Sequence, residues 1–259
     1  MQILAGVMRR MKIKEGTWMA TLAATCFAIW GVQARVITAA PPAQEATGEI
    51  TGKVLFEGTK PQLREIYMNK DPECVRENQG RVVYQQDGAV NSNGTLPNVF
   101  VFAKSGAQGL HSSPPSTPAT LDQQGCIFVP HVLGIMAGQP LKVLNSDFTT
   151  HNVHAMGKDN PRWNESQPPG AAPFYKKIEH PEIMVPLECN EHPWMKAYIG
   201  VVTNPIYDVT GPRGTFTIKN VPPGTYTIEA WTATFGTQEK TVTVHAHETA
   251  TLDFTFRHE

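Results

Sequence analysis

Alternation of apolar and polar residues predicts β-strands along most of the chain beyond residue 35. The alternating stretches are residues 48–56, 98–103, 214–230, 239–245 and 249–256. The first of them follows a Gly-x-Ile-x-Gly-x-Val pattern, and the third turns at Pro222-Pro223-Gly224. Hardly any long stretch shows the 3.6-residue period of a helix, and 21 Gly and 21 Pro supply turns. We therefore predict an all-β protein.

The middle of the chain holds further predicted strands. Residues 128–145 predict two strands around a Gly turn, ahead of His151. A row of alternating residues that share one face follows later, at Ile183, Val185, Leu187 and Cys189. Because side chains in a strand alternate between faces, Cys189 is expected to extend a core-facing row, and His154 to point away from the side that His151 faces. Pro186 in this run indicates an edge strand or a bulge.

Length and charge limit the class of protein. The chain has 259 residues, of which 41% are hydrophobic, and a net charge of −1. It is long enough for a sizeable core and for two small domains. This composition indicates neither disorder nor nucleic-acid binding.

Residues 1–34 are predicted to be a signal peptide. A basic start precedes an apolar run over residues 17–32, and Val32-Gln33-Ala34 forms a small-x-Ala cleavage site. A membrane span needs about 20 apolar residues, so an uncleaved membrane anchor is the less favoured reading. We expect cleavage near Ala34 and a periplasmic or secreted protein with a net charge of −4.

A cluster of potential metal ligands is the most specific feature of the sequence. Cys189, His192 and Met195 follow at Cys-x2-His-x2-Met spacing, and His151 lies 38 residues before the Cys. Two imidazoles, a thiolate and a thioether are the ligands of a blue-copper electron-transfer site. His131, beside a proline at a strand start, is expected to be structural.

Two other chemistries stay open as minor alternatives. A zinc site with these residues would normally recruit a fourth Cys, His or carboxylate rather than a methionine. A cysteine nucleophile with a histidine base is the second alternative. No Gly-rich loop or helix start near Cys189 is evident that would serve as an oxyanion hole.

The cysteine count adds a disulfide to the prediction. Beyond the leader the chain has three cysteines, Cys74, Cys126 and Cys189, and an exported protein with an odd number leaves one unpaired. If Cys189 binds metal, Cys74 and Cys126 are expected to pair. Two buried free thiols are the alternative.

The metal-ligand region resembles the cupredoxins, and among them the amicyanins. The resemblance rests on His151-Asn152-Val153-His154, on Cys189-x-x-His192-Pro193-x-Met195 and on the strand-like residues 196–202, and it covers roughly residues 120–205. It implies one type 1 copper per chain, with His151, Cys189, His192 and Met195 as ligands. It also implies that Asn152 braces the metal loop from outside the ligand set. Glu188 departs from the family, which usually has an aromatic residue there.

A second resemblance concerns the flanks of this region. The pattern of residues 48–56 and the hairpin of residues 214–230 resemble carboxypeptidase-regulatory-like, or Cna-B-like, β-sandwiches. We expect a cupredoxin Greek-key β-sandwich over residues 120–205, inserted into a second, Ig-like sandwich split between residues 47–110 and 206–257. Sandwiches strung in series are the alternative.

The resemblance implies a one-electron carrier that is not an enzyme. Redox donor and acceptor proteins are expected to dock near His192, Pro193 and Trp194, because the family's C-terminal histidine edge lies near the surface. No nucleic-acid partner is expected, and membrane association is expected only if the leader stays uncleaved. The alternatives are a copper-holding or delivery protein, and a cell-surface interaction module with a structural metal.

Overall fold

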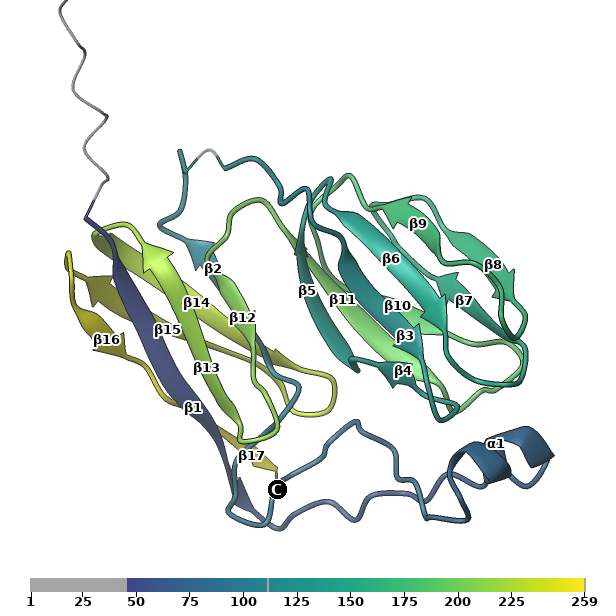
Figure 1. Cartoon of the computed structure of the whole chain (residues 1–259). Helices are drawn as coiled ribbons and strands as arrows, with labels where there is room; N and C mark the ends of the chain where they lie inside the picture. Colours follow the sequence, from purple (N-terminus) through teal and green to yellow (C-terminus); the bar gives the residue numbers. More distant parts are fainter. Residues whose placement is uncertain (1–45, 111, 259) are drawn as a thin grey trace, which may run out of the picture. The chain divides into compact units, whose positions relative to one another are not determined.

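The computed structural model describes residues 46–110 and 112–258. These residues form two β-sandwiches and a long loop segment with one short helix (Figure 1). The all-β prediction is confirmed. The leader predicted over residues 1–34 lies outside the described residues. Within the described part, no helix combines the length and the apolar content needed to cross a membrane.

The first sandwich, sandwich A, combines strands from the two ends of the described chain. Its strands are β1 (Gly48–Gly58), β2 (Phe100–Ser105), β12 (Tyr207–Val209), β13 (Thr215–Val221), β14 (Gly224–Thr232), β15 (Gly236–Val244), β16 (Thr249–Thr251) and β17 (Phe254–His258). One sheet has the order β13-β1-β16, with β17 also paired to β1, and the other has the order β12-β2-β14-β15. The early strands β1 and β2 thus pair with late strands in both sheets. The domain boundaries given above stay a prediction.

Sandwich A has one shared hydrophobic core. Its buried residues include Ile50 and Val54 of β1, Val101 of β2, Ile228 of β14 and Phe254 of β17. The alternation seen in the sequence places these side chains inside, because every second residue of a strand faces the same way. β1 also passes so close to the chain between β16 and β17 that a Cβ at Gly52 would collide with the backbone carbonyl of Leu252.

Sandwich B lies between these segments in the sequence. Its strands are β3 (Ala119–Gln123), β4 (Phe128–Val129), β5 (Val132–Met136), β6 (Pro140–Asn145), β7 (His151–Ala155), β8 (Trp163–Gln167), β9 (Phe174–Lys177), β10 (Glu182–Glu188) and β11 (Lys196–Val202). The sheets have the orders β5-β11-β10-β7-β8 and β4-β3-β6-β9. Because β10 pairs with both β7 and β11, the start of β7 and the loop after β10 meet at one end of the sandwich.

Strand β10 departs from the predicted alternation at its start. Ile183 is 40% exposed, whereas Met184 is buried with φ +64°. The pairing with β11 shifts register between Glu182 and Val185, and such a bulge changes which residues face inward. The inward placement of Ile183 is therefore wrong, while the later members of the row are buried as predicted.

Residues 59–99, the capping segment, connect β1 to β2 and contain α1 (Pro72–Glu77). The helix begins after Asp71, whose carboxylate accepts the Glu73 N–H at 2.8 Å, and Pro72 fits the first helical position. Cys74 and Cys126 form a disulfide, so the predicted pairing is confirmed. The bridge is buried and packs against Trp194. It ties the capping segment to sandwich B.

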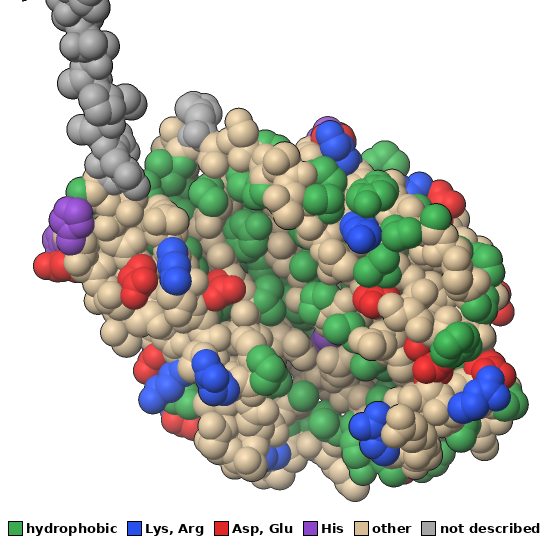
Figure 2. Space-filling model, in the orientation of Figure 1, with side chains coloured by type: hydrophobic (Ala, Val, Ile, Leu, Met, Phe, Trp, Pro, Cys, Tyr) green, Lys and Arg blue, Asp and Glu red, His purple; other side chains and the backbone are tan. Residues whose placement is uncertain are grey.

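Acidic and basic side chains are mixed on the face of the molecule that Figure 2 draws. On the face drawn in Figure 2, Lys and Arg are interspersed with Asp and Glu. A surface of this kind has no large field of one sign on that face.

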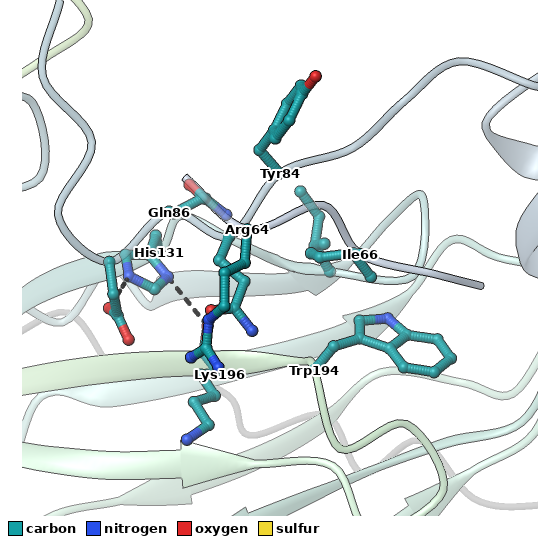
Figure 3. A pocket seen from close by; sticks show the side chains of 10 residues that line it. Arg64, Ile66, Tyr84, Gln86, His131, Trp194 and Lys196 are labelled. Atoms are coloured by element: carbon teal, nitrogen blue, oxygen red, sulfur yellow. Dashed lines mark hydrogen bonds and ion pairs between the residues drawn. The ribbon is translucent and has the colours of Figure 1, made fainter. Parts of the chain in front are cut away.

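His131 has the structural contacts expected for it. Its Nε2 lies 2.8 Å from Asp87 Oδ1 of the capping segment, and its Nδ1 lies 3.0 Å from the Lys196 carbonyl (Figure 3). The Tyr198 hydroxyl donates to the other oxygen of Asp87 at 3.2 Å. These bonds attach the capping segment to sandwich B at a second point.

Candidate metal centre

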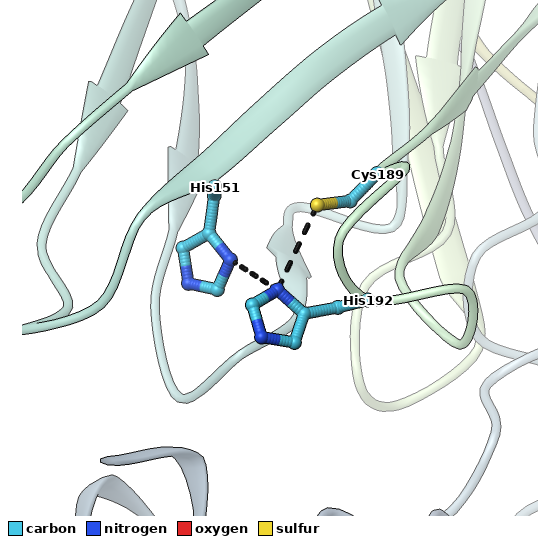
Figure 4. Close-up of side chains that lie close together, drawn as sticks. All are labelled: His151, Cys189 and His192. Atoms are coloured by element: carbon cyan, nitrogen blue, oxygen red, sulfur yellow. Dashed lines mark hydrogen bonds between the residues drawn. The ribbon is translucent and has the colours of Figure 1, made fainter. Parts of the chain in front are cut away.

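Three potential ligand atoms converge at one end of sandwich B. His151 opens β7, Cys189 follows β10, and His192 lies in the loop before β11. The Nδ1 atoms of His151 and His192 are 2.9 Å apart, and Cys189 Sγ is 3.7 Å from His192 Nδ1 (Figure 4). Metal bonds of about 2.0 Å to nitrogen and about 2.3 Å to sulfur place ligand atoms about 3.3–3.7 Å apart. The three atoms are therefore close to the spacing of one coordination sphere.

The loop that carries the sulfur and one imidazole closes on itself. The Met195 N–H donates to the His192 carbonyl at 2.9 Å, and the Cys189 N–H donates to the Met195 carbonyl at 3.3 Å. These two bonds hold the loop in a compact turn. Met195 is fully buried and shares the core of sandwich B with Cys189. The structure thus brings the ligand atoms of His151, Cys189 and His192 together, and it places Met195 in the same loop and core.

Both imidazoles are held from outside by carboxylates. His151 Nε2 lies 2.9 Å from Asp147 Oδ2, and His192 Nε2 lies 2.9 Å from Asp71 Oδ2. An ionised carboxylate accepts hydrogen bonds and does not donate them, so each histidine carries a proton on Nε2. Each Nδ1 then faces the cluster. The carboxylates orient the rings as outer partners of metal ligands do.

The sequence reasoning missed both aspartates. Asp147 lies four residues before His151, and this short spacing was a usable signal. Asp71 lies 121 residues before His192, in a segment without regular periodicity. Only the fold brings it to the site.

Asn152 lies where a bracing residue is expected. Its side-chain oxygen accepts the Asn190 N–H at 2.7 Å and lies 3.3 Å from Cys189 Sγ. Its own N–H points at the same sulfur at 3.5 Å, and its side-chain amide donates to Asn164 of β8 at 2.6 Å. Asn152 therefore links β8 to the loop after β10. Its role toward a metal stays a prediction.

The environment shifts the pKa values of the cluster. Burial raises the pKa of the Cys189 thiol, but hydrogen bonds from His151, His192 and the Asn152 N–H outweigh burial and lower it to about 6. Burial lowers the pKa of His151, but the bonds to Asp147 and Cys189 raise it to about 9. At neutral pH a thiolate therefore lies beside an imidazolium. A metal ion that takes both groups as ligands must displace the imidazolium proton.

His192 lies beside a surface groove, as expected, but is itself buried. Its relative exposure is only 4%, because Asp71 covers its outer nitrogen and Trp194 lies against it with ring centroids 5.0 Å apart. The ring still borders an open groove of about 840 Å³, which is also lined by Tyr67, Lys70 and Pro193. His154 is not among the converging ligands: its Nδ1 lies 3.2 Å from Asn190 Oδ1.

Comparison with known proteins covers both sandwiches in part. Residues 197–257 match the family model of the carboxypeptidase regulatory-like domain. A copper-containing nitrite reductase (NirK) from Thermus scotoductus SA-01 is 22% identical over 33% of this chain and 22% of that chain, with a TM-score of 0.30. A purple cupredoxin from Nitrosopumilus maritimus is 18% identical over 32% of this chain and 98% of the cupredoxin, with a TM-score of 0.28. An amicyanin mutant in the Cu(I) form is 15% identical over 39% of this chain and 97% of the amicyanin, with a TM-score of 0.29. The comparison with curated protein sequences finds no match.

Residues 197–257 are thus similar to a carboxypeptidase regulatory-like domain, and cupredoxins are among the solved structures that are similar to part of this chain. The expectation drawn from the two resemblances is thus confirmed. At these identities and TM-scores the structural matches show no function for this chain. The chain spans only 22% of the length of the nitrite reductase.

One expectation drawn from the family resemblance is corrected. The sequence reasoning concluded that the protein is not an enzyme. The matched structures include an enzyme, the nitrite reductase. The conclusion is therefore withdrawn.

Proposed function

We propose that the protein binds one type 1 copper ion and carries single electrons between redox proteins. His151, Cys189 and His192 supply the three principal ligands, and Met195 supplies a weak axial one. The convergence of two Nδ1 atoms and one sulfur in a buried site supports this proposal most directly. Copper in such a set cycles between Cu(II) and Cu(I). The chain fixes the ligands through the closed loop and the two carboxylates.

The competing chemistries fit the site less well. Cys189 is 2% exposed, so a substrate has little access to it as a nucleophile. A zinc site needs a fourth good ligand, yet the nearby oxygens of Asp71 and Asp147 are bonded to the outer nitrogens of the two histidines. The thioether of Met195 suits copper better than zinc.

The proposal includes export to the periplasm or the cell exterior. The disulfide between Cys74 and Cys126 supports it, since disulfides persist mainly in oxidising compartments. The leader predicted over residues 1–34 provides the route. Membrane association is proposed only for a chain that keeps this leader.

Redox partners are proposed to dock at the groove beside His192. Pro193 and Trp194 line this groove, together with Tyr67, which is 72% exposed. Weak electron-transfer encounters bury less than about 1,200 Å² of surface, and a groove with an exposed aromatic rim suits such a short contact. Docking at the groove is favoured over direct contact of a partner with the His192 imidazole edge, because Asp71 covers that edge.

Metal loading of the full-length protein tests the proposed function. The protein should take up one copper per chain and become blue when oxidised, because a Cu(II)–thiolate bond in this ligand set absorbs strongly. Cys189→Ser should abolish the colour, and His151→Ala should weaken copper binding. His154→Ala is the matched control and should behave like the wild type. Stoichiometric zinc with no copper uptake would overturn the proposal, and rapid loss of copper to a chelator would favour a copper-delivery function instead.

A further inference from the structure

The capping segment touches each of the loops that surround the candidate metal centre. Asn78 donates from its side chain to the Gly125 carbonyl at 2.9 Å. Glu77 accepts the Phe148 N–H at 3.0 Å, and Asp71 meets His192. The three contacts come from the two ends of α1: Asp71 caps its start, Glu77 is its last residue and Asn78 caps its end. This part of the capping segment is therefore built against the site.

The Asp71 carboxylate is fixed independently of any metal. One oxygen caps α1 by accepting the Glu73 N–H at 2.8 Å. The other accepts from the Thr149 hydroxyl and from His192 Nε2, each at 2.9 Å. Three residues further on, Cys74 is bonded to Cys126. These contacts fix the position of the Asp71 carboxylate relative to the His192 imidazole.

We propose that Asp71 is a positioning residue of the metal centre, delivered to His192 by the disulfide-tethered capping segment. The inference rests on the proposed function and adds that Asp71 influences the reduction potential of the copper. By accepting the Nε2 proton, Asp71 directs Nδ1 of His192 toward Cys189 and His151. Its negative charge also favours the more positively charged ion, Cu(II), over Cu(I).

Asp71 acts from the side of the site that faces the groove. His151 has a carboxylate partner from its own loop, Asp147. The His192 ring would be open at Nε2 without the capping segment, because the carboxylate at Nε2 belongs to Asp71 of that segment. Asp71 therefore combines two effects on one ligand: it fixes the orientation of the ring, and it covers the outer nitrogen.

Three variants of the full-length, copper-loaded protein separate these effects from general stability. Asp71→Asn keeps an acceptor but removes the charge, and Asp71→Ala removes both. Glu191→Gln is the matched control, because it removes an exposed carboxylate next to His192, whereas the ring's carboxylate partner in the described part of the chain is Asp71. The measurements are copper affinity by chelator competition, reduction potential by voltammetry, and the visible spectrum.

We expect Asp71→Ala to weaken Cu(II) binding about 10–100-fold, as loss of an outer partner of a metal ligand does, and Asp71→Asn to weaken it less. Since Cu(II) loses more than Cu(I), the potential should rise, and each tenfold change in the affinity ratio corresponds to 59 mV. Glu191→Gln should stay near the wild type. If both Asp71 variants keep the wild-type potential and affinity and only melt earlier, Asp71 merely holds the capping segment, and the inference fails. A wild type that takes up no copper overturns the proposed function and this inference together.

Discussion

Two opposed effects set the pKa of the Cys189 side chain at the candidate centre. Burial raises the pKa of Cys189, yet hydrogen bonds from the side chains of two histidines and from two backbone N–H groups lower it to about 6. The balance leaves a thiolate, the form that binds metal, in a position that is 2% exposed. The same residue therefore extends a hydrophobic row of β10 and supplies a charged ligand. This double role explains why strand alternation and ligand spacing both pointed to Cys189.

Met195 offers a test at the scale of one atom. Changing Met195 to Gln should leave copper bound and alter the reduction potential, because the axial ligand tunes the potential while the two imidazoles and the thiolate hold the metal. Placing a polar amide at this fully buried position should also cost about 1–3 kcal/mol of stability. Voltammetry, metal analysis and thermal unfolding measure the three effects. Met156→Gln, a change at a partly exposed residue, is the control. Equal potentials in the two variants would remove Met195 from the ligand set.

At the scale of elements, regular alternation was predictable and its interruptions were not. In the late part of β10 every second side chain faces inward as the sequence predicts, because successive side chains of a strand point to opposite faces. The bulge at Met184 depends on how β10 pairs with β11, and no local pattern encodes that register. The ligand motif was readable because its residues are close in sequence. Asp71 was not, because a helix cap and a disulfide across 52 residues place it.

The start of β10 carries a network whose effect depends on pH. Glu182 is buried and accepts four hydrogen bonds, from the N–H groups of Lys158, Asp159 and Asn160 and from the Asn160 side chain. Burial raises the pKa of Glu182, but these donors outweigh burial and hold it below the ordinary value. The ionised form is thus stabilised in the folded state. Its contribution to stability is complete above the ordinary glutamate pKa of about 4.3, and is lost as the pH falls through the lower folded value.

Glu182→Gln should therefore destabilise the protein at pH 7 and much less in acid. A hydrogen bond to a charged group contributes about 1.5–3 kcal/mol, and a loss of about 2 kcal/mol lowers the melting temperature by about 4–8 °C for a chain of this size. Thermal unfolding of variant and wild type between pH 7 and pH 3 measures the difference. Glu165→Gln, at an exposed residue of β8, is the control. A difference between Glu182→Gln and wild type that does not shrink in acid would show that the charge of Glu182 is not its cause.

For the whole molecule, the fold makes the two ends of the described chain dependent on each other. Both sheets of sandwich A have an early strand at an interior position, β1 in one and β2 in the other. The matched family region, residues 197–257, contains neither of them. The repeated strand patterns at the two ends were visible in the sequence, but their pairing was a guess from resemblance, since pairing partners more than 150 residues apart leave no local trace.

A fragment of residues 206–259 should consequently be unfolded. In the described structure, β13, β16 and β17 each pair with β1, and without it the hairpin of β14 and β15 is the principal pairing left in the fragment. A two-stranded hairpin is marginally stable at best in water, and the loss of β1 and β2 also removes buried residues such as Ile50, Val54 and Val101 from the core. Amide resonance dispersion and thermal unfolding of the fragment measure the outcome. Adding a peptide of residues 46–60 tests whether β1 alone restores order, with a Gly52→Val peptide as control, since a side chain there collides with the Leu252 carbonyl. A cooperative transition and dispersed resonances from the fragment alone would show that residues 206–259 fold without the early strands, and would contradict a sandwich split between the two ends of the chain.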